Sequence, residues 1–118
     1  MFGADGSGSV DYPDVAGEVC RAVLSKNAEL AILICGTGIG MSMAANRNAG
    51  IRAALCSDCV SAGLTRSHNN ANVLCIGARI LGPELVLGIV DKFLSTKFDG
   101  GRHSRRIEKI EACRCGGV

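Results

Sequence analysis

The sequence predicts an α/β fold in which helices cover both faces of a parallel sheet, giving three layers. Three short apolar runs, each typical of a buried strand, alternate with segments of helical periodicity. This alternation is typical of βαβ units, whose right-handed crossovers produce a parallel sheet. The chain has 118 residues and 47% hydrophobic content, which is enough for one domain with a modest core.

The N-terminal part is expected to be a loop, a turn and a helix. Residues 1–10 are rich in glycine and serine and should form a loop. A turn at residues 11–14 follows, and Asp14 at its end is the expected N-cap of an amphipathic helix over residues 15–24. A compact α/β domain normally begins with a strand. The sequence therefore suggests that N-terminal elements of the fold are missing.

The central segment is expected to fold as a strand, a tight glycine turn and a helix. Residues 30–34 form an unbroken apolar run that Cys35 closes. The turn at residues 36–40 reads GTGIG, and residues 41–46 have the composition of a helix. Everything else in the chain is arranged around this unit.

The glycine turn also has the chemistry of an anion site. Gly36, Gly38 and Gly40 let backbone N–H groups point together at an anion, and a helix start favours negative charge. A thiol at Cys35 would be favoured there as a thiolate, which is a usable base. The turn lacks the lysine of a phosphate-binding loop and matches the dinucleotide-binding fingerprint only in part. From these residues alone, a structural turn and a reactive site are about equally favoured.

The rest of the chain continues the alternation. The expected strands cover residues 51–56 and 72–77, and the expected helices cover residues 59–67, 84–95 and 102–113. Asp58 is the expected N-cap of the first of these helices, and Pro83 suits the first position of the next. Ligands of parallel sheets bind at the carboxyl ends of strands, so Cys35, Cys56 and Arg79 should lie at the ligand-binding edge. Residues 11–113 would then be the folded part of a single domain spanning 1–118, with 114–118 as a frayed tail.

Composition argues against several other classes of protein. Seven cysteines without a signal-peptide pattern are expected to be reduced thiols of a cytoplasmic protein. Cys56, Cys59, Cys113 and Cys115 match no standard zinc spacing, so no metal site is predicted. The net charge is only +2, and the basic C-terminal part lacks the interleaved aromatics of a nucleic-acid site. No apolar run approaches the ~20 residues needed to span a membrane.

Five ordered segments carry a resemblance to a known family, and together they run from about residue 11 to about residue 110. They are DYPDVAGEVC, ILICGTGIGMSMAANR, GIRAALC, RSHNNANVLCIGAR and FDGGRHSRR. In this order and spacing they resemble the ribose-5-phosphate isomerase B and galactose-6-phosphate isomerase family. The resemblance implies a three-layer Rossmann-like sheet that is N-terminally truncated here, because family members begin with a further strand, helix and strand. The missing strand would leave an apolar edge beside residues 30–34.

The resemblance implies a cofactor-free aldose–ketose isomerase that interconverts ribose 5-phosphate and ribulose 5-phosphate through an enediolate. Cys35 matches the family's catalytic base, Thr37 belongs to its anion hole, and His68 matches its ring-opening acid and base. The expected substrate-binding residues are Tyr12, Gly36, Gly38, Gly40, Asn69, Arg79, Arg102 and Arg106. Arginine forks suit a phosphate dianion. A galactose-6-phosphate isomerase subunit and a non-catalytic sugar-phosphate-binding fragment are the alternatives.

The predicted catalytic residues lie at opposite edges of the predicted sheet. Cys35 follows a strand and belongs to the carboxyl edge, whereas His68 precedes a strand and belongs to the amino edge. One subunit can hardly bring the two side chains together. The sequence therefore predicts a homodimer, or a dimer of dimers, with composite active sites, which the family resemblance also implies.

Overall fold

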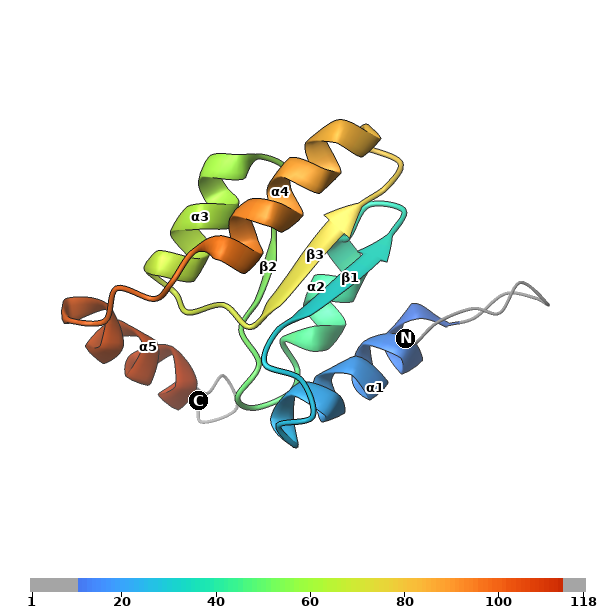
Figure 1. Cartoon of the computed structure of the whole chain (residues 1–118). Helices are drawn as coiled ribbons and strands as arrows, with labels where there is room; N and C mark the ends of the chain where they lie inside the picture. The colour runs from blue at the N-terminus through green and yellow to red at the C-terminus, as the bar shows by residue number, and fades with distance from the viewer. Residues whose placement is uncertain (1–10, 114–118) are drawn as a thin grey trace.

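The computed structural model describes residues 11–113, which form a parallel sheet with helices on both faces (Figure 1). The predicted loop 1–10 and the predicted tail 114–118 lie outside the described residues. In chain order the elements are α1 (Tyr12–Leu24), β1 (Ala31–Cys35), α2 (Ile39–Ala45), β2 (Ala53–Leu55), α3 (Cys59–Ser67), β3 (Val73–Gly77), α4 (Pro83–Ser95) and α5 (Arg102–Ala112).

The sheet has the strand order β1-β3-β2, and both strand pairings are parallel. Cys35 at the end of β1 is paired with Gly77 at the end of β3, so both lie at the carboxyl edge. Within residues 11–113 no strand pairs with the outer side of β1, and Ile34 there is 52% exposed. An apolar edge at this strand was predicted, and the described residues contain one.

Two hydrophobic clusters hold the three layers together. Helices α1 and α2 cover one face of the sheet, and α3 and α4 cover the other (Figure 1). Val19, Val23 and Met41 belong to the first cluster, and Ile89 and Phe93 belong to the second. All five residues of β3 are buried, as expected for a central strand covered on both faces. The predicted three-layer α/β fold is therefore confirmed.

The first helix and the second strand differ most from their predicted bounds. Helix α1 begins at Tyr12 rather than at residue 15, because Pro13 sits in its first turn, where its fixed φ favours the helix. Strand β2 is only three residues long. The Arg52 N–H donates to the Asn72 side chain at 2.8 Å instead of to a strand, and Asn46 makes two hydrogen bonds to the Ala53 backbone.

Helix α5 stands apart from the layers. None of its residues is buried, and an ion pair of 2.6 Å between Arg52 and Glu111 ties its C-terminal end to the segment that enters β2. The helix ends at Ala112, one residue before its predicted end. Among residues 11–113, no helix has both the length and the apolar character that crossing a bilayer requires.

Candidate active site

The turn after β1 places backbone N–H groups around the Cys35 thiol. The Gly38 N–H donates to Cys35 Sγ at 3.1 Å, and the Ile39 N–H donates to Thr37 Oγ1 at 3.2 Å. Gly38 has φ +80°, a left-handed conformation that glycine adopts without strain. A backbone donor therefore points directly at the sulfur of the predicted base. The Thr37 hydroxyl is occupied in shaping the turn, so its role at the anion hole stays a prediction.

The end of β3 packs directly against this turn. A Cβ added at Gly77 would lie 2.4 Å from the Thr37 carbonyl oxygen and 2.6 Å from its carbon. These are backbone atoms and cannot rotate away. The absence of a side chain at Gly77 therefore allows β3 to approach the thiol turn.

The Gly77→Ala variant is expected to lose about 1–3 kcal/mol of stability, because the added methyl must displace the Thr37 backbone. Urea unfolding followed by circular dichroism measures this loss. Gly82→Ala is the matched control, since no atom lies within 4 Å of a Cβ at that position. Equal unfolding midpoints for the two variants would contradict the packing described here.

Two further predicted residues reach the same edge. A Cβ at Gly40 would lie 2.5 Å from the Tyr12 hydroxyl and ring, so the first residue of α1 covers the turn. Arg79 lies over Gly36, with its Cδ 3.4 Å from the position of a Cβ there. The Arg79 N–H also donates to the Gly36 carbonyl at 2.9 Å. The carboxyl edge thus gathers a thiol, a phenol, a guanidinium and a glycine turn.

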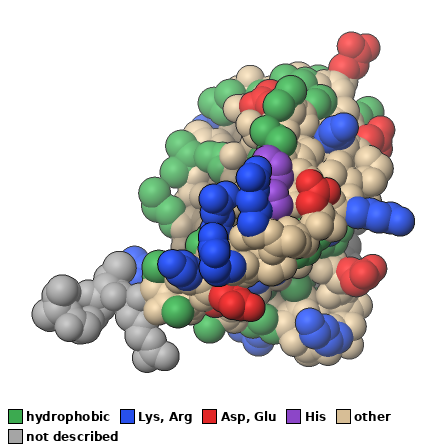
Figure 2. All heavy atoms as spheres, turned by 90° about the vertical axis from the view of Figure 1, so that its left-hand side faces the viewer, with side chains coloured by type: hydrophobic (Ala, Val, Ile, Leu, Met, Phe, Trp, Pro, Cys, Tyr) green, Lys and Arg blue, Asp and Glu red, His purple; other side chains and the backbone are tan. Residues whose placement is uncertain are grey.

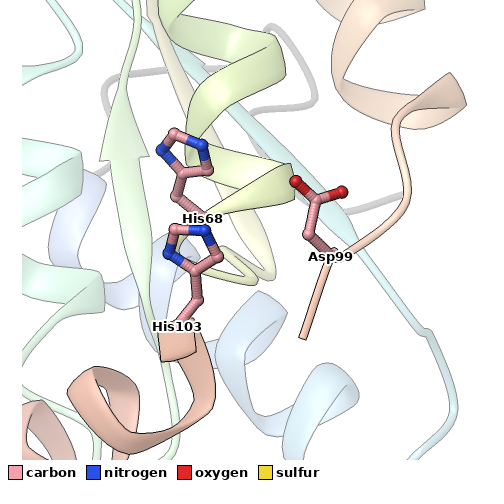
Figure 3. A group of neighbouring side chains, drawn as sticks. All are labelled: His68, Asp99 and His103. Atoms are coloured by element: carbon pink, nitrogen blue, oxygen red, sulfur yellow. The ribbon is translucent and has the colours of Figure 1, made fainter. Parts of the chain in front are cut away.

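A second group lies at the other end of the sheet. His68 is the C-cap of α3, and its ring stacks on that of His103, with ring centroids 4.3 Å apart and planes 13° from parallel. Figure 3 shows the two rings beside the Asp99 carboxylate. The segment FDGGRHSRR contains both Asp99 and His103, but neither was predicted as a site residue. Their sequence positions did not reveal that they meet His68.

Positive charge surrounds these histidines. Partial burial lowers the pKa of His103, and the charges of His68, Arg102 and Arg106 lower it further, while Asp99 acts in the opposite direction. Figure 2 shows Lys and Arg side chains next to His on this face of the molecule. Two of the predicted phosphate-binding arginines, Arg102 and Arg106, therefore lie near His103, whose ring stacks on His68.

The two groups are separated by the length of the sheet. Strands β1 and β3 have five residues each. At ~3.3 Å per residue their two ends are roughly 13 Å apart. Cys35, Tyr12 and Arg79 lie at one end and His68 lies at the other. As predicted, one subunit does not bring the thiol and this histidine together.

Asn69 does not share a pocket with the Cys35 thiol. It borders a hollow of about 690 Å³ at the side of α5 and β2, which is also lined by Arg52 and Glu111. Its carbonyl accepts from Arg52 Nε at 3.2 Å. Neither Cys35 nor His68 lines this hollow, so it is separate from the predicted chemistry.

The six described cysteines are all free thiols, and they differ sharply in burial. Burial raises the pKa of Cys20, raises that of Cys56 to about 11 and raises that of Cys75 to about 12. Cys35 and Cys59 are half-buried and reachable from the surface. Since the thiolate is the nucleophile, only the accessible thiols should react near neutrality.

At pH 8, iodoacetamide is expected to label Cys35 and Cys59 much faster than Cys56 and Cys75. The raised pKa values keep Cys56 protonated below about pH 11 and Cys75 protonated below about pH 12. An increase to pH 9 should therefore not make either thiol reactive. Peptide mass spectrometry measures the labelling, and the urea-unfolded chain is the control in which every cysteine should react. Rapid labelling of Cys75 in the folded chain would contradict the burial.

Comparisons with known proteins assign the family. The family model described as Ribose/Galactose Isomerase matches residues 1–110. Ribose-5-phosphate isomerase B of Escherichia coli is 51% identical over 86% of this chain and 68% of that protein. D-erythrulose-4-phosphate isomerase of Pectobacterium atrosepticum is 46% identical over 84% of this chain and 65% of that protein. The crystal structure of a Thermotoga maritima ribose 5-phosphate isomerase superimposes with a TM-score of 0.91 at 58% identity, covering 94% of this chain and 77% of that one. The chain therefore belongs to the ribose/galactose isomerase family and is a sugar-phosphate isomerase.

Proposed function

We propose that this protein interconverts ribose 5-phosphate and ribulose 5-phosphate through an enediolate, with Cys35 as the base. The observation that carries the proposal is the Cys35 thiol at the strand end, with the Gly38 N–H donating to its sulfur at 3.1 Å. The names of the Escherichia coli and Thermotoga maritima relatives support the pentose phosphate as substrate.

The proposed chemistry is a proton transfer between neighbouring carbons. The Cys35 thiolate removes the proton from C2 of the open-chain aldose, and the electron pair moves onto the C1 carbonyl oxygen to give the enediolate. N–H groups of the glycine turn 36–40, with Thr37, stabilise this anion. Transfer of the C2 hydroxyl proton to the C1 oxygen, and return of the first proton from the Cys35 thiol to C1, then produce the ketose. These steps require a base and anion donors and use no cofactor.

The other half of the proposed site comes from a second subunit. His68 would open the sugar ring as acid and base, while Arg102 and Arg106 beside it would bind the phosphate dianion. Tyr12, Asn69 and Arg79 are proposed to contact the substrate. Because Cys35 and His68 lie at opposite ends of one sheet, a dimer that faces the two ends toward each other would complete the site.

The first experiment compares the purified chain on three substrates: ribose 5-phosphate, galactose 6-phosphate and D-erythrulose 4-phosphate. The highest kcat/KM is expected with the pentose phosphate. A preference for the hexose phosphate would indicate a galactose-6-phosphate isomerase subunit. Binding of all three without turnover, by a folded chain, would indicate a non-catalytic sugar-phosphate-binding protein and contradict the proposal.

The Arg102→Ala variant is expected to raise KM for ribose 5-phosphate about tenfold or more, because a charge-assisted bond to phosphate contributes roughly 1.5–3 kcal/mol. Steady-state kinetics measure the effect. Arg105→Ala is the matched control from the same helix, since Arg105 is not among the charges acting on His103. Equal KM values for the two variants would remove Arg102 from the phosphate site.

Mixing two inactive variants tests the composite site. Cys35→Ala and His68→Asn chains should each be inactive alone. When unfolded together and refolded, a random dimer mixture should recover about a quarter of wild-type activity, because half the dimers carry one intact site. Refolded wild-type protein is the control. Failure of the mixture to recover activity, with dimers present by size-exclusion chromatography, would rule out sites shared between subunits.

A further inference from the structure

His68, Asp99 and His103 form a cluster of metal-ligand side chains away from the thiol turn (Figure 3). Each offers one ligand atom, and these three atoms all lie within 4.8 Å of one another. His68 caps α3, Asp99 lies in the loop between α4 and α5, and His103 is in the first turn of α5. Three separate parts of the chain therefore converge on one point.

We propose that His68, Asp99 and His103 form a binding site for a divalent transition-metal ion such as Zn²⁺. Bound metal would inhibit the isomerase reversibly, because it would occupy the ring nitrogen that His68 needs as acid and base. This inhibition rests on the function proposed above, whereas the binding of metal does not.

The donor set selects the class of ion. Two imidazole nitrogens and one carboxylate oxygen are ligands that Zn²⁺ and its neighbours in the transition series accept, with a fourth position left open. Mg²⁺ and Ca²⁺ prefer sites made of oxygen atoms alone. The cluster should therefore bind Zn²⁺ in preference to Mg²⁺.

The cluster has to close by side-chain rotation before it can coordinate a metal ion. Zinc bonds of ~2.0–2.1 Å in a tetrahedral site place the ligand atoms roughly 3.4 Å apart. The cluster is somewhat wider, and its side chains are exposed or half-buried and can rotate. Their backbone positions are anchored: the His68 N–H donates to the Leu64 carbonyl at 2.8 Å, and the Asp99 N–H donates to the Ser67 carbonyl at 3.0 Å. The proposal therefore expects closure by side-chain rotation, which must unstack the two imidazole rings.

Some charges around the cluster favour the binding of a metal cation, and others oppose it. Within residues 11–113 the single ion pair joins Arg52 and Glu111, which leaves the Asp99 carboxylate available to a cation. Arg102 and Arg106 lie near enough to act on His103, and their charge weakens metal binding. The same charge favours an anion at the open fourth position. The carboxylate of Asp99 is therefore the group on which binding should depend most.

Calorimetric titration of the purified full chain with ZnCl₂ tests the site directly. One Zn²⁺ per chain is expected, and Asp99→Asn and His103→Gln should each weaken binding at least about tenfold. Asp91→Asn is the matched control, because Asp91 is an exposed carboxylate on α4 outside the cluster. Circular dichroism checks that each variant is folded. No binding by the wild-type chain would overturn the proposal. Binding by the Asp99 and His103 variants as tight as that of the wild type would also overturn it, and would place the bound zinc elsewhere, for example at the thiols.

Initial rates with ribose 5-phosphate test the inhibition. Zn²⁺ should inhibit the wild-type chain, a chelator should restore the rate, and Asp99→Asn should need at least about tenfold more Zn²⁺ for the same effect. Zinc that binds in the calorimeter without slowing the reaction would overturn the inhibition. A chain without any turnover would contradict the proposed function and the inhibition, while the titration would still decide the metal site.

Discussion

The Cys35→Ala variant is expected to lose at least about 10²-fold in kcat/KM for ribose 5-phosphate, since a positioned base contributes 10²–10⁴-fold. No other described thiol accepts a hydrogen bond from the glycine turn as Cys35 does from Gly38. The fold should remain, because the change removes one sulfur atom from a half-buried position. A coupled assay of ketose formation measures the rate, and circular dichroism measures the fold.

Two further variants separate the chemistry of Cys35 from its packing. Cys35→Ser keeps an acceptor for the Gly38 N–H but cannot form a thiolate, so it should be nearly as inactive as the alanine variant. Cys59→Ala removes another half-buried thiol, at the start of α3, and should keep wild-type activity. If Cys35→Ala retained its rate, the base would have to be a different group.

The Phe93→Ala variant is expected to lose about 4 kcal/mol of stability, within the 3–5 kcal/mol typical of a buried phenylalanine. Phe93 is 0% exposed and is the largest fully buried side chain of the described residues. The guanidinium of Arg66 lies 5.7 Å from its ring centroid and also donates to the Ala71 carbonyl at 2.6 Å. The variant would therefore leave a cavity and loosen the segment that leads into β3.

Urea unfolding measures the Phe93 effect, and the next residue supplies its control. Leu94 is 53% exposed, so Leu94→Ala should change the stability by only about 0.5 kcal/mol. Since a domain of this size has a total stability of roughly 5–15 kcal/mol, Phe93→Ala should lie near the limit of folding. Comparable midpoints for the two alanine variants would mean that the second cluster does not hold α4 on the sheet.

Local signals were sufficient for most elements and for the first half of the site. Asp58 was predicted as the N-cap of α3, and it accepts the Ser61 N–H at 2.7 Å. Pro83 starts α4 as predicted. Capping and φ restriction act within one turn, so neighbouring residues reveal them. The strand, glycine turn and helix around Cys35 are local in the same sense.

Where local signals compete with distant partners, the sequence was less informative. Residues 51–56 read as one apolar strand, yet the side chains of Asn46 and Asn72 take hydrogen bonds at its start, which leaves three residues of β2. Helix α1 likewise begins early, at Tyr12, where it covers Gly40. Asn72 lies 20 residues from Arg52, and Gly40 lies still farther from Tyr12, so a short window of sequence contains neither pair.

The order of residues was thus enough to predict the alternation of strands and helices, the glycine turn behind Cys35 and the separation of Cys35 from His68, because these depend on periodicity and on positions along a strand. The placement of β3 between β1 and β2, the contact of Gly77 with Thr37 and the stacking of His68 on His103 depend on the tertiary structure. Each of these joins residues at least 20 positions apart in the chain, and only packing of the whole core brings such residues together.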